Sequence, residues 1–107
     1  MELRIYSTQN GIAPFSDWLR SLKDPIARAQ IRARLTRLQT GNFGDCKAVR
    51  DKVHELRVHH GPGYRVLFSR RGDHLVVLLS GSHKAQQRKA IDLAVEYLKD
   101  WEQRGKP

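Results

Sequence analysis

Cysteine is nearly absent from this sequence of 107 residues, since Cys46 is the single example. One cysteine cannot form an internal disulfide, which excludes a disulfide-stapled secreted domain. We therefore expect a reducing, cytoplasmic setting in which Cys46 is a free structural thiol. Long hydrophobic runs are lacking too, because the longest, over residues 75–79, is far shorter than a bilayer requires. The N-terminal residues contain no apolar stretch of signal-sequence length, so no membrane partner is expected.

Metal-binding and nucleophile motifs are also missing. The five histidines include the adjacent pair His59 and His60, which point to opposite faces if they lie in a strand and so do not readily share an ion. No glycine-rich phosphate loop of the P-loop type occurs, and no serine lies in a nucleophile elbow. The sequence therefore predicts neither a metal nor a cofactor.

Acidic residues are scarce relative to basic ones, with 11 Asp and Glu against 20 Lys and Arg and a net charge of +9. Such an excess indicates a polyanionic or acidic partner, such as nucleic acid. Residues 20–50 alone hold eight basic residues against two acidic ones, a net charge of +6. Arg28 and Arg32 belong to this segment, and we expect them to contact phosphate groups, although a merely solvated helix face explains the same pattern.

Hydrophobic periodicity predicts a single α+β domain over residues 1–107. Residues 2–7 alternate as a short strand, and helices are expected to begin at Pro14 and at Pro25, the second with Asp24 as its N-cap. The short connection between them favours an N-terminal helical hairpin. Residues 41–52 are predicted to form a loop, and three strands are then expected over residues 53–60, 64–69 and 75–80.

The third of these strands is apolar almost throughout, so we expect it to be covered on both faces. A last helix is predicted to follow, with Ser82 as its N-cap and a tail that frays from about residue 103. The predicted element order is β-α-α-β-β-β-α. It describes a small, mainly antiparallel sheet with an N-terminal helical hairpin and a C-terminal helix.

One face of the predicted strands is cationic. Arg57, His59 and Arg65 alternate with the apolar side chains of their strands, and His83 and Lys84 come just before the last helix. An RNA phosphodiester can be cleaved by its own 2′-hydroxyl if the protein moves two protons and stabilises the extra charge on phosphorus. Lys and His suit the proton transfers, and Arg suits the phosphorane because its fork binds two oxygens. A solvated strand face is the plainer alternative.

Several motifs in a fixed order resemble a known superfamily. They are F-x-x-W-L-x-x-L-K-D from Phe15, A-R-A-x-I-x-x-R-L-x-R-L from Ala27, G-N-x-G-D-x-K from Gly41, E-L-R-V-H-x-G-P-G-Y-R-V-x-F from Glu55 and L-L-S-G-S-H-K-x-x-Q from Leu78. Together they cover about three quarters of the chain and resemble the RelE/ParE toxin superfamily, in particular its HigB-like addiction-module killer proteins, which are often phage-associated.

This resemblance implies a RelE-like fold and a bacterial toxin that a helix-turn-helix antitoxin neutralises, with operator DNA bound only through the antitoxin. For HigB-like members it also implies a metal-independent endoribonuclease that cuts mRNA on the ribosome and so inhibits translation. It assigns catalytic roles to Arg57 and Arg65 as phosphate binders and to His83 and Lys84 in proton transfer. Lys47 is then a substrate-contacting lysine. His59, on the cationic strand face, is expected to be a further substrate-binding residue.

The resemblance is not complete at one position. Many relatives have an acidic residue before the lysine of the last motif, where this chain has His83. His83 either adds an imidazole to the site or replaces a cap. Two other functions stay open: a ParE-type poison of DNA gyrase, and a non-catalytic basic module that binds nucleic acid.

Overall fold

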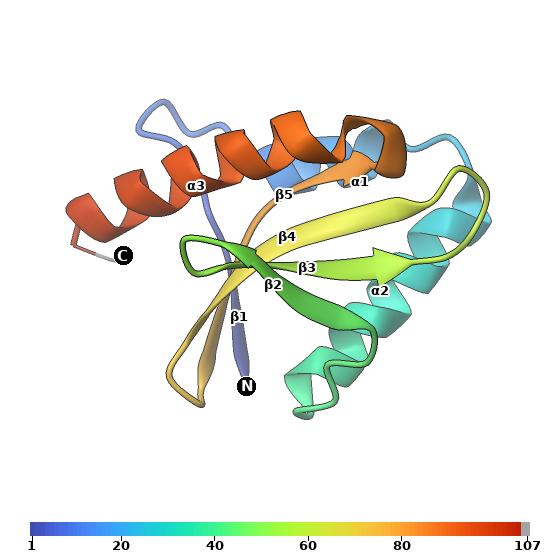
Figure 1. Cartoon of the computed structure of the whole chain (residues 1–107), viewed down its shortest axis with the longest axis horizontal. Helices are drawn as coiled ribbons and strands as arrows, with labels where there is room; N and C mark the ends of the chain where they lie inside the picture. Colours follow the sequence, from blue (N-terminus) through green and yellow to red (C-terminus); the bar gives the residue numbers. More distant parts are fainter. Residues whose placement is uncertain (106–107) are drawn as a thin grey trace.

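The computed structural model describes residues 1–105 and has the predicted α+β architecture (Figure 1). Five strands form one sheet in the order β1-β5-β4-β3-β2, in which β1 runs parallel to β5 and every other neighbouring pair is antiparallel. The elements in chain order are β1 (Glu2–Ile5), α1 (Pro14–Ser21), α2 (Pro25–Gln39), β2 (Cys46–Arg50), β3 (Val53–Val58), β4 (Tyr64–Arg71), β5 (Leu75–His83), the 3-10 turn η1 (Lys84–Gln86) and α3 (Gln87–Gln103).

Each face of the sheet carries its own apolar core. α1 and α2 cover one face, where Leu56, Val66 and Phe68 are buried, and α3 covers the other, where Leu67 is buried. Adjacent residues of β4 serve opposite cores because side chains alternate along a strand. The apolar run of β5 is buried on both faces, as its composition predicted.

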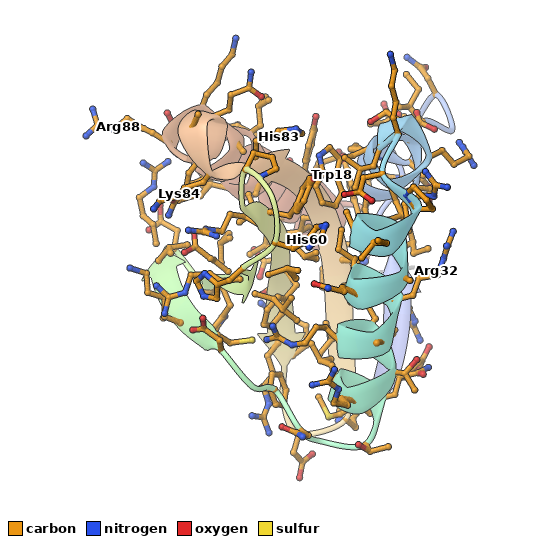
Figure 2. All side chains as sticks on the ribbon, turned by 90° about the vertical axis from the view of Figure 1, so that its right-hand side faces the viewer. Trp18, Arg32, His60, His83, Lys84 and Arg88 are labelled. Carbon is orange, nitrogen blue, oxygen red and sulfur yellow. The ribbon has the colours of Figure 1, made fainter. Side chains whose placement is uncertain are left out.

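The two N-terminal helices begin where proline permits. Pro14 and Pro25 occupy first-turn positions, and the Asp24 side chain accepts a 2.9 Å hydrogen bond from the backbone N–H of Ile26, which confirms it as an N-cap. The two helices do not lie side by side as a closed hairpin. α1 packs mainly on β5, and α2 continues away from it along the same face of the sheet (Figure 2).

The predicted loop over residues 41–52 is wrong in its second half, because Cys46–Arg50 forms edge strand β2 paired with β3. Its pattern is mostly polar and contains a bulge between Ala48 and Arg50, so the usual apolar alternation is missing. The turn to β3 uses Asp51 and Lys52, both with positive φ, 48° and 70°. Hairpin turns of that shape normally carry Asn-Gly or Asp-Gly, and this turn therefore has no sequence signal.

The predicted N-cap at Ser82 is also wrong. β5 continues through Ser82 to His83, and α3 begins only after η1. β5 is longer than its apolar run because Ser82 still pairs in register with Arg65 of β4. α3 ends at Gln103, and Arg104 donates hydrogen bonds to Asp100 and to the Ser7 carbonyl. The rest of the tail predicted to fray, residues 106–107, lies outside the described residues.

Gly81 permits a close contact between α1 and the sheet. A Cβ at this position would lie 2.1 Å from Cε3 of Trp18, so α1 reaches β5 only because the residue has no side chain. We predict that Gly81→Ala lowers the free energy of unfolding by about 3 kcal/mol, the upper part of the range for overpacking. Denaturant unfolding measures this cost. In a Trp18→Ala background the same change is expected to cost much less, and strictly additive effects would contradict the assigned contact.

A buried phenol ties the end of α3 to the segment after β1. Tyr6 donates a 2.6 Å hydrogen bond to Asp100, whose pKa is lowered by that bond and by Arg104. Burial, followed by the Asp100 interaction, raises the pKa of Tyr6 from 10.0 to about 12. The folded state therefore favours the neutral phenol, and this stabilisation is complete below pH 10 and is lost as the pH rises to about 12.

We therefore predict that wild-type stability falls more steeply than that of Tyr6→Phe between pH 10 and pH 12. Chemical denaturation at several pH values in this interval provides the measurement. The two stability curves should approach each other toward pH 12, where the phenol is ionised in the unfolded state and about half ionised in the folded state. Parallel curves would show that Tyr6 does not ionise differently in the folded and unfolded protein.

Candidate functional site

The two strand arginines predicted for the site are direct neighbours. Arg57 of β3 lies opposite Arg65 of β4, and Arg65 lies opposite Ser82 of β5. All three belong to the α3 face of the sheet, opposite Leu56 and Val66, so the predicted cationic face is confirmed. Two cations in register repel each other, and each needs its own compensating acid.

Arg65 is compensated by a buried carboxylate. Its side chain is 6% exposed and that of Glu55 is 1% exposed, with 3.6 Å between the Arg65 Nε and the Glu55 Oε1. The other carboxylate oxygen of Glu55 accepts a 2.5 Å hydrogen bond from Nε2 of Gln87, the first residue of α3. Glu55 thus links the site arginine to the start of α3. The sequence carried a signal for this role, because Glu55 is an acid that shares its strand face with the cations Arg57 and His59.

Arg57 is compensated by Asp45, which precedes β2. Oδ1 of Asp45 accepts hydrogen bonds from Nε and Nη2 of Arg57, at 3.1 and 2.7 Å, and its Oδ2 lies 2.6 Å from Nε2 of His59. The bond to His59, then those from Arg57, hold the pKa of Asp45 below its usual value. Asp45 therefore fixes the orientation of the His59 imidazole, a role that sequence analysis did not assign.

Arg34 of α2 is used to build this corner rather than to bind a ligand. Its Nη1 donates to the Arg57 carbonyl at 2.6 Å, and its Nη2 donates to the carbonyls of Phe43 and Asp45 at 3.2 and 3.3 Å. Its guanidinium satisfies backbone groups of the segment before β2. The excess of arginine in α2 is thus partly structural, which composition alone does not reveal.

A small hollow at the end of the β3–β4 hairpin brings several predicted residues together. This central pocket has a volume of about 330 Å³ and is lined by His59, His60, Gly61, Pro62, Gly63, Arg65 and Lys84. Lys84 reaches it because its backbone N–H donates to the Gly63 carbonyl at 3.0 Å. His60 lies 2.8 Å from Asp24 at the start of α2, and this contact holds the hairpin loop in place. The pocket therefore combines one buried guanidinium, one exposed ammonium and two imidazoles.

His83 is not part of this pocket. It lies opposite Tyr64 across the β4–β5 pair, with 5.2 Å between the ring centroids, and Tyr64 belongs to the core on the α1 and α2 face. Adjacent residues of β5 point to opposite faces, so Ser82 rather than His83 accompanies Arg65. The expected grouping of His83 with the strand arginines is therefore wrong.

The remaining predicted residues lie outside the pocket. Lys47 is exposed on edge strand β2, opposite Glu55. Arg28 donates a hydrogen bond to the Leu22 carbonyl, and Arg32 points into solvent from α2, on the side away from Lys84 and Arg88 (Figure 2). The two helix arginines therefore do not share a surface with Arg65, because α2 covers the other face of the sheet.

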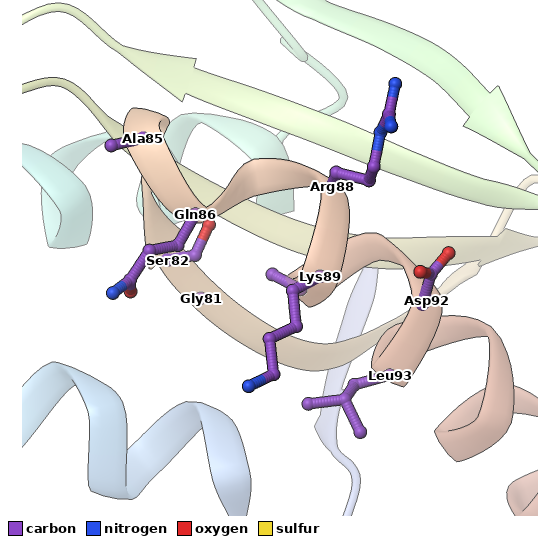
Figure 3. A pocket seen from close by; sticks show the side chains of 9 residues that line it. Gly81, Ser82, Ala85, Gln86, Arg88, Lys89, Asp92 and Leu93 are labelled. Carbon is purple, nitrogen blue, oxygen red and sulfur yellow. The ribbon is translucent and has the colours of Figure 1, made fainter.

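A different hollow has a volume of about 650 Å³ (Figure 3). It lies beside the first turns of α3, and its wall includes Gly81, Ser82, Lys89 and Leu93 but none of the residues predicted for chemistry.

Within residues 1–105 no group of three or more His, Cys, Asp or Glu side chains is placed to hold a metal ion. No helix in the same range is both long and apolar enough to cross a bilayer.

Two comparisons with known proteins bear on identity. The family of phage derived Gp49-like proteins (DUF891) matches residues 17–99, from α1 into α3. An uncharacterized protein of Haemophilus influenzae is 49% identical over 80 residues, which are 75% of this chain and 81% of that protein. The matched region includes the central pocket and every residue assigned to it. The chain therefore belongs to the Gp49-like family of phage-derived proteins, a family associated with toxin–antitoxin modules.

Proposed function

We propose that this protein is the toxin of a type II toxin–antitoxin module and that it cleaves mRNA on the ribosome. The observation that carries the proposal is the central pocket, where Arg65, Lys84 and His59 meet at the end of one hairpin. Family membership supports the toxin class, and the HigB-like motifs and the cationic pocket support an RNA phosphodiester as the target.

The pocket contains the groups that RNA self-cleavage requires. The His59 imidazole has its Nε2 at Asp45, and its Nδ1 accepts the proton of the 2′-hydroxyl as the hydroxyl oxygen attacks phosphorus. The P–O5′ bond breaks, and the Lys84 ammonium gives its proton to the departing 5′-oxygen. The products are a 2′,3′-cyclic phosphate and a free 5′-hydroxyl, so protons and electron pairs balance. Arg65, held beside Glu55, stabilises the phosphorane, and Arg57 adds positive charge from the next strand.

The same cationic surface suits an inhibitory partner. In this proposal a helix-turn-helix antitoxin covers the pocket with acidic or C-terminal carboxylate groups, and operator DNA is bound through that antitoxin. The toxin acts in the cytoplasm, where the ribosome presents the mRNA. A net charge of +9 favours approach to ribosomal RNA and to an acidic antitoxin surface alike.

We predict that Lys84→Ala lowers the rate of mRNA cleavage by about a hundredfold or more, as expected for loss of a general acid, while the fold is retained because the Lys84 side chain is exposed. Arg65→Lys, which keeps the charge beside Glu55, should also abolish growth arrest because it loses the two-pronged phosphate contact. Induced cultures provide the readout, through growth curves and primer extension on a translated transcript. Lys99→Ala, an equal charge loss far along α3, serves as the control.

Three outcomes would contradict the proposal. Folded wild-type protein that leaves translated mRNA uncut sinks the nuclease assignment. Growth arrest with gyrase–DNA adducts and intact mRNA would identify a gyrase poison. Salt-sensitive RNA or DNA binding without cleavage would identify a non-catalytic binding module.

A further inference from the structure

The central pocket has a neighbouring hollow on each side, and it shares one lining residue with each of them. The α2-side hollow, about 330 Å³, is lined by Gln30, Ala33, Arg34, Arg37, Val58 and His59, and it shares His59 with the central pocket. The α3-side hollow, about 490 Å³, has Val49, Arg50, Gln87 and Arg88 in its wall and shares Lys84 with the central pocket. The three hollows thus follow one another from the second half of α2 to the first turn of α3, linked at His59 and Lys84, and we call this series the groove.

Besides the shared Lys84, each flanking hollow contains one cation whose side chain has neither an acid nor a carbonyl partner among residues 1–105. Arg37 and Arg88 are exposed, and neither forms an ion pair with any acid of residues 1–105. The other two arginines of the flanking hollows have partners within the protein. Arg34 donates hydrogen bonds to backbone carbonyls, and Arg50 lies 2.7 Å from Asp92. Arg37 and Arg88 are therefore the groups available to an anionic ligand at the two ends of the groove.

The path of the groove restricts the shape of that ligand. It begins beside α2, passes His59 just after the end of β3 and continues beside the first turn of α3. A ligand that fills it must bend around the end of a hairpin and carry negative charge at intervals. A single nucleic-acid strand has both properties, whereas a duplex is too stiff to turn around one hairpin.

From these observations we infer that the groove binds one RNA strand of several nucleotides, with Arg37 and Arg88 as phosphate subsites on either side of the scissile phosphate. This inference rests on the proposed function for the central pocket and adds two binding subsites to it. The strand enters along α2 and leaves along α3, or the reverse. Arg37 and Arg88 contact non-reacting phosphates and determine affinity and substrate length rather than the chemical step.

Fluorescence anisotropy with 2′-O-methyl RNA tests the inference separately from cleavage, because this RNA lacks the attacking hydroxyl. The probes are an oligonucleotide of about ten nucleotides, within the usual range of single-strand site sizes, and a dinucleotide. Arg37→Ala and Arg88→Ala should each lower the association constant of the long probe about fivefold at 0.1 M salt and reduce the salt slope by about 0.7, the value of one phosphate contact on a single strand. Binding of the dinucleotide should not change.

Two matched variants control for loss of charge. Arg20→Ala removes an exposed arginine of α1, and Lys99→Ala removes an exposed lysine of α3, both outside the groove. The inference is overturned if all four variants weaken binding equally, which indicates diffuse attraction, or if Arg37→Ala and Arg88→Ala change nothing. It is also overturned if a polyglutamate peptide binds and RNA does not, which indicates an acidic protein segment in the groove. Binding as expected without cleavage in cells would retain the groove and reject only the nuclease.

Discussion

The interaction on which the structure depends is the buried contact between Glu55 and Arg65 in the middle of the sheet. An ion pair at this depth is costly to desolvate, and a well-packed apolar pair would serve stability at least as well. Its value lies in what it positions. Glu55 holds the Arg65 guanidinium at the wall of the central pocket and also anchors Gln87 at the start of α3. One carboxylate thus connects the cationic site to the helix that covers the same face.

A second carboxylate, that of Asp45, positions cations at the edge of the site, as Glu55 positions Arg65 in its interior. Asp45 holds Arg57 and the His59 imidazole, while Arg34 fixes the backbone that carries Asp45. The site is therefore surrounded by cations that are either neutralised by a dedicated acid or left free to meet a ligand. Among residues 1–105, Lys84, Arg37 and Arg88 have no ion pair with an acid, and they line the groove. The basic residues behind the net charge of +9 therefore divide into those that stabilise the structure and those that can bind a ligand.

Features of the fold and the site that depend on local sequence patterns could be predicted from the sequence. The helix starts at Pro14 and Pro25, the cap at Asp24 and the shared face of Arg57 and Arg65 follow from proline geometry and strand alternation. Strand β2 could not be predicted from the sequence, because its polar edge pattern has no apolar alternation and its turn at Asp51 and Lys52 has no glycine. His83 was misplaced because the length of β5 depends on pairing with β4, which is not encoded locally.

The sequence by itself determined the class of the domain, the presence of a cationic strand face and the membership in a toxin-like family, because each of these is written in periodicity, composition or ordered motifs. Only the tertiary structure decided which cations act together. Side chains from positions as distant as Asp45 and Lys84 meet at one hairpin, and the sheet register sends Ser82 and His83 to opposite faces. The physical reason is that neutralisation of a charge depends on distance in space, and the sheet and its helices set those distances.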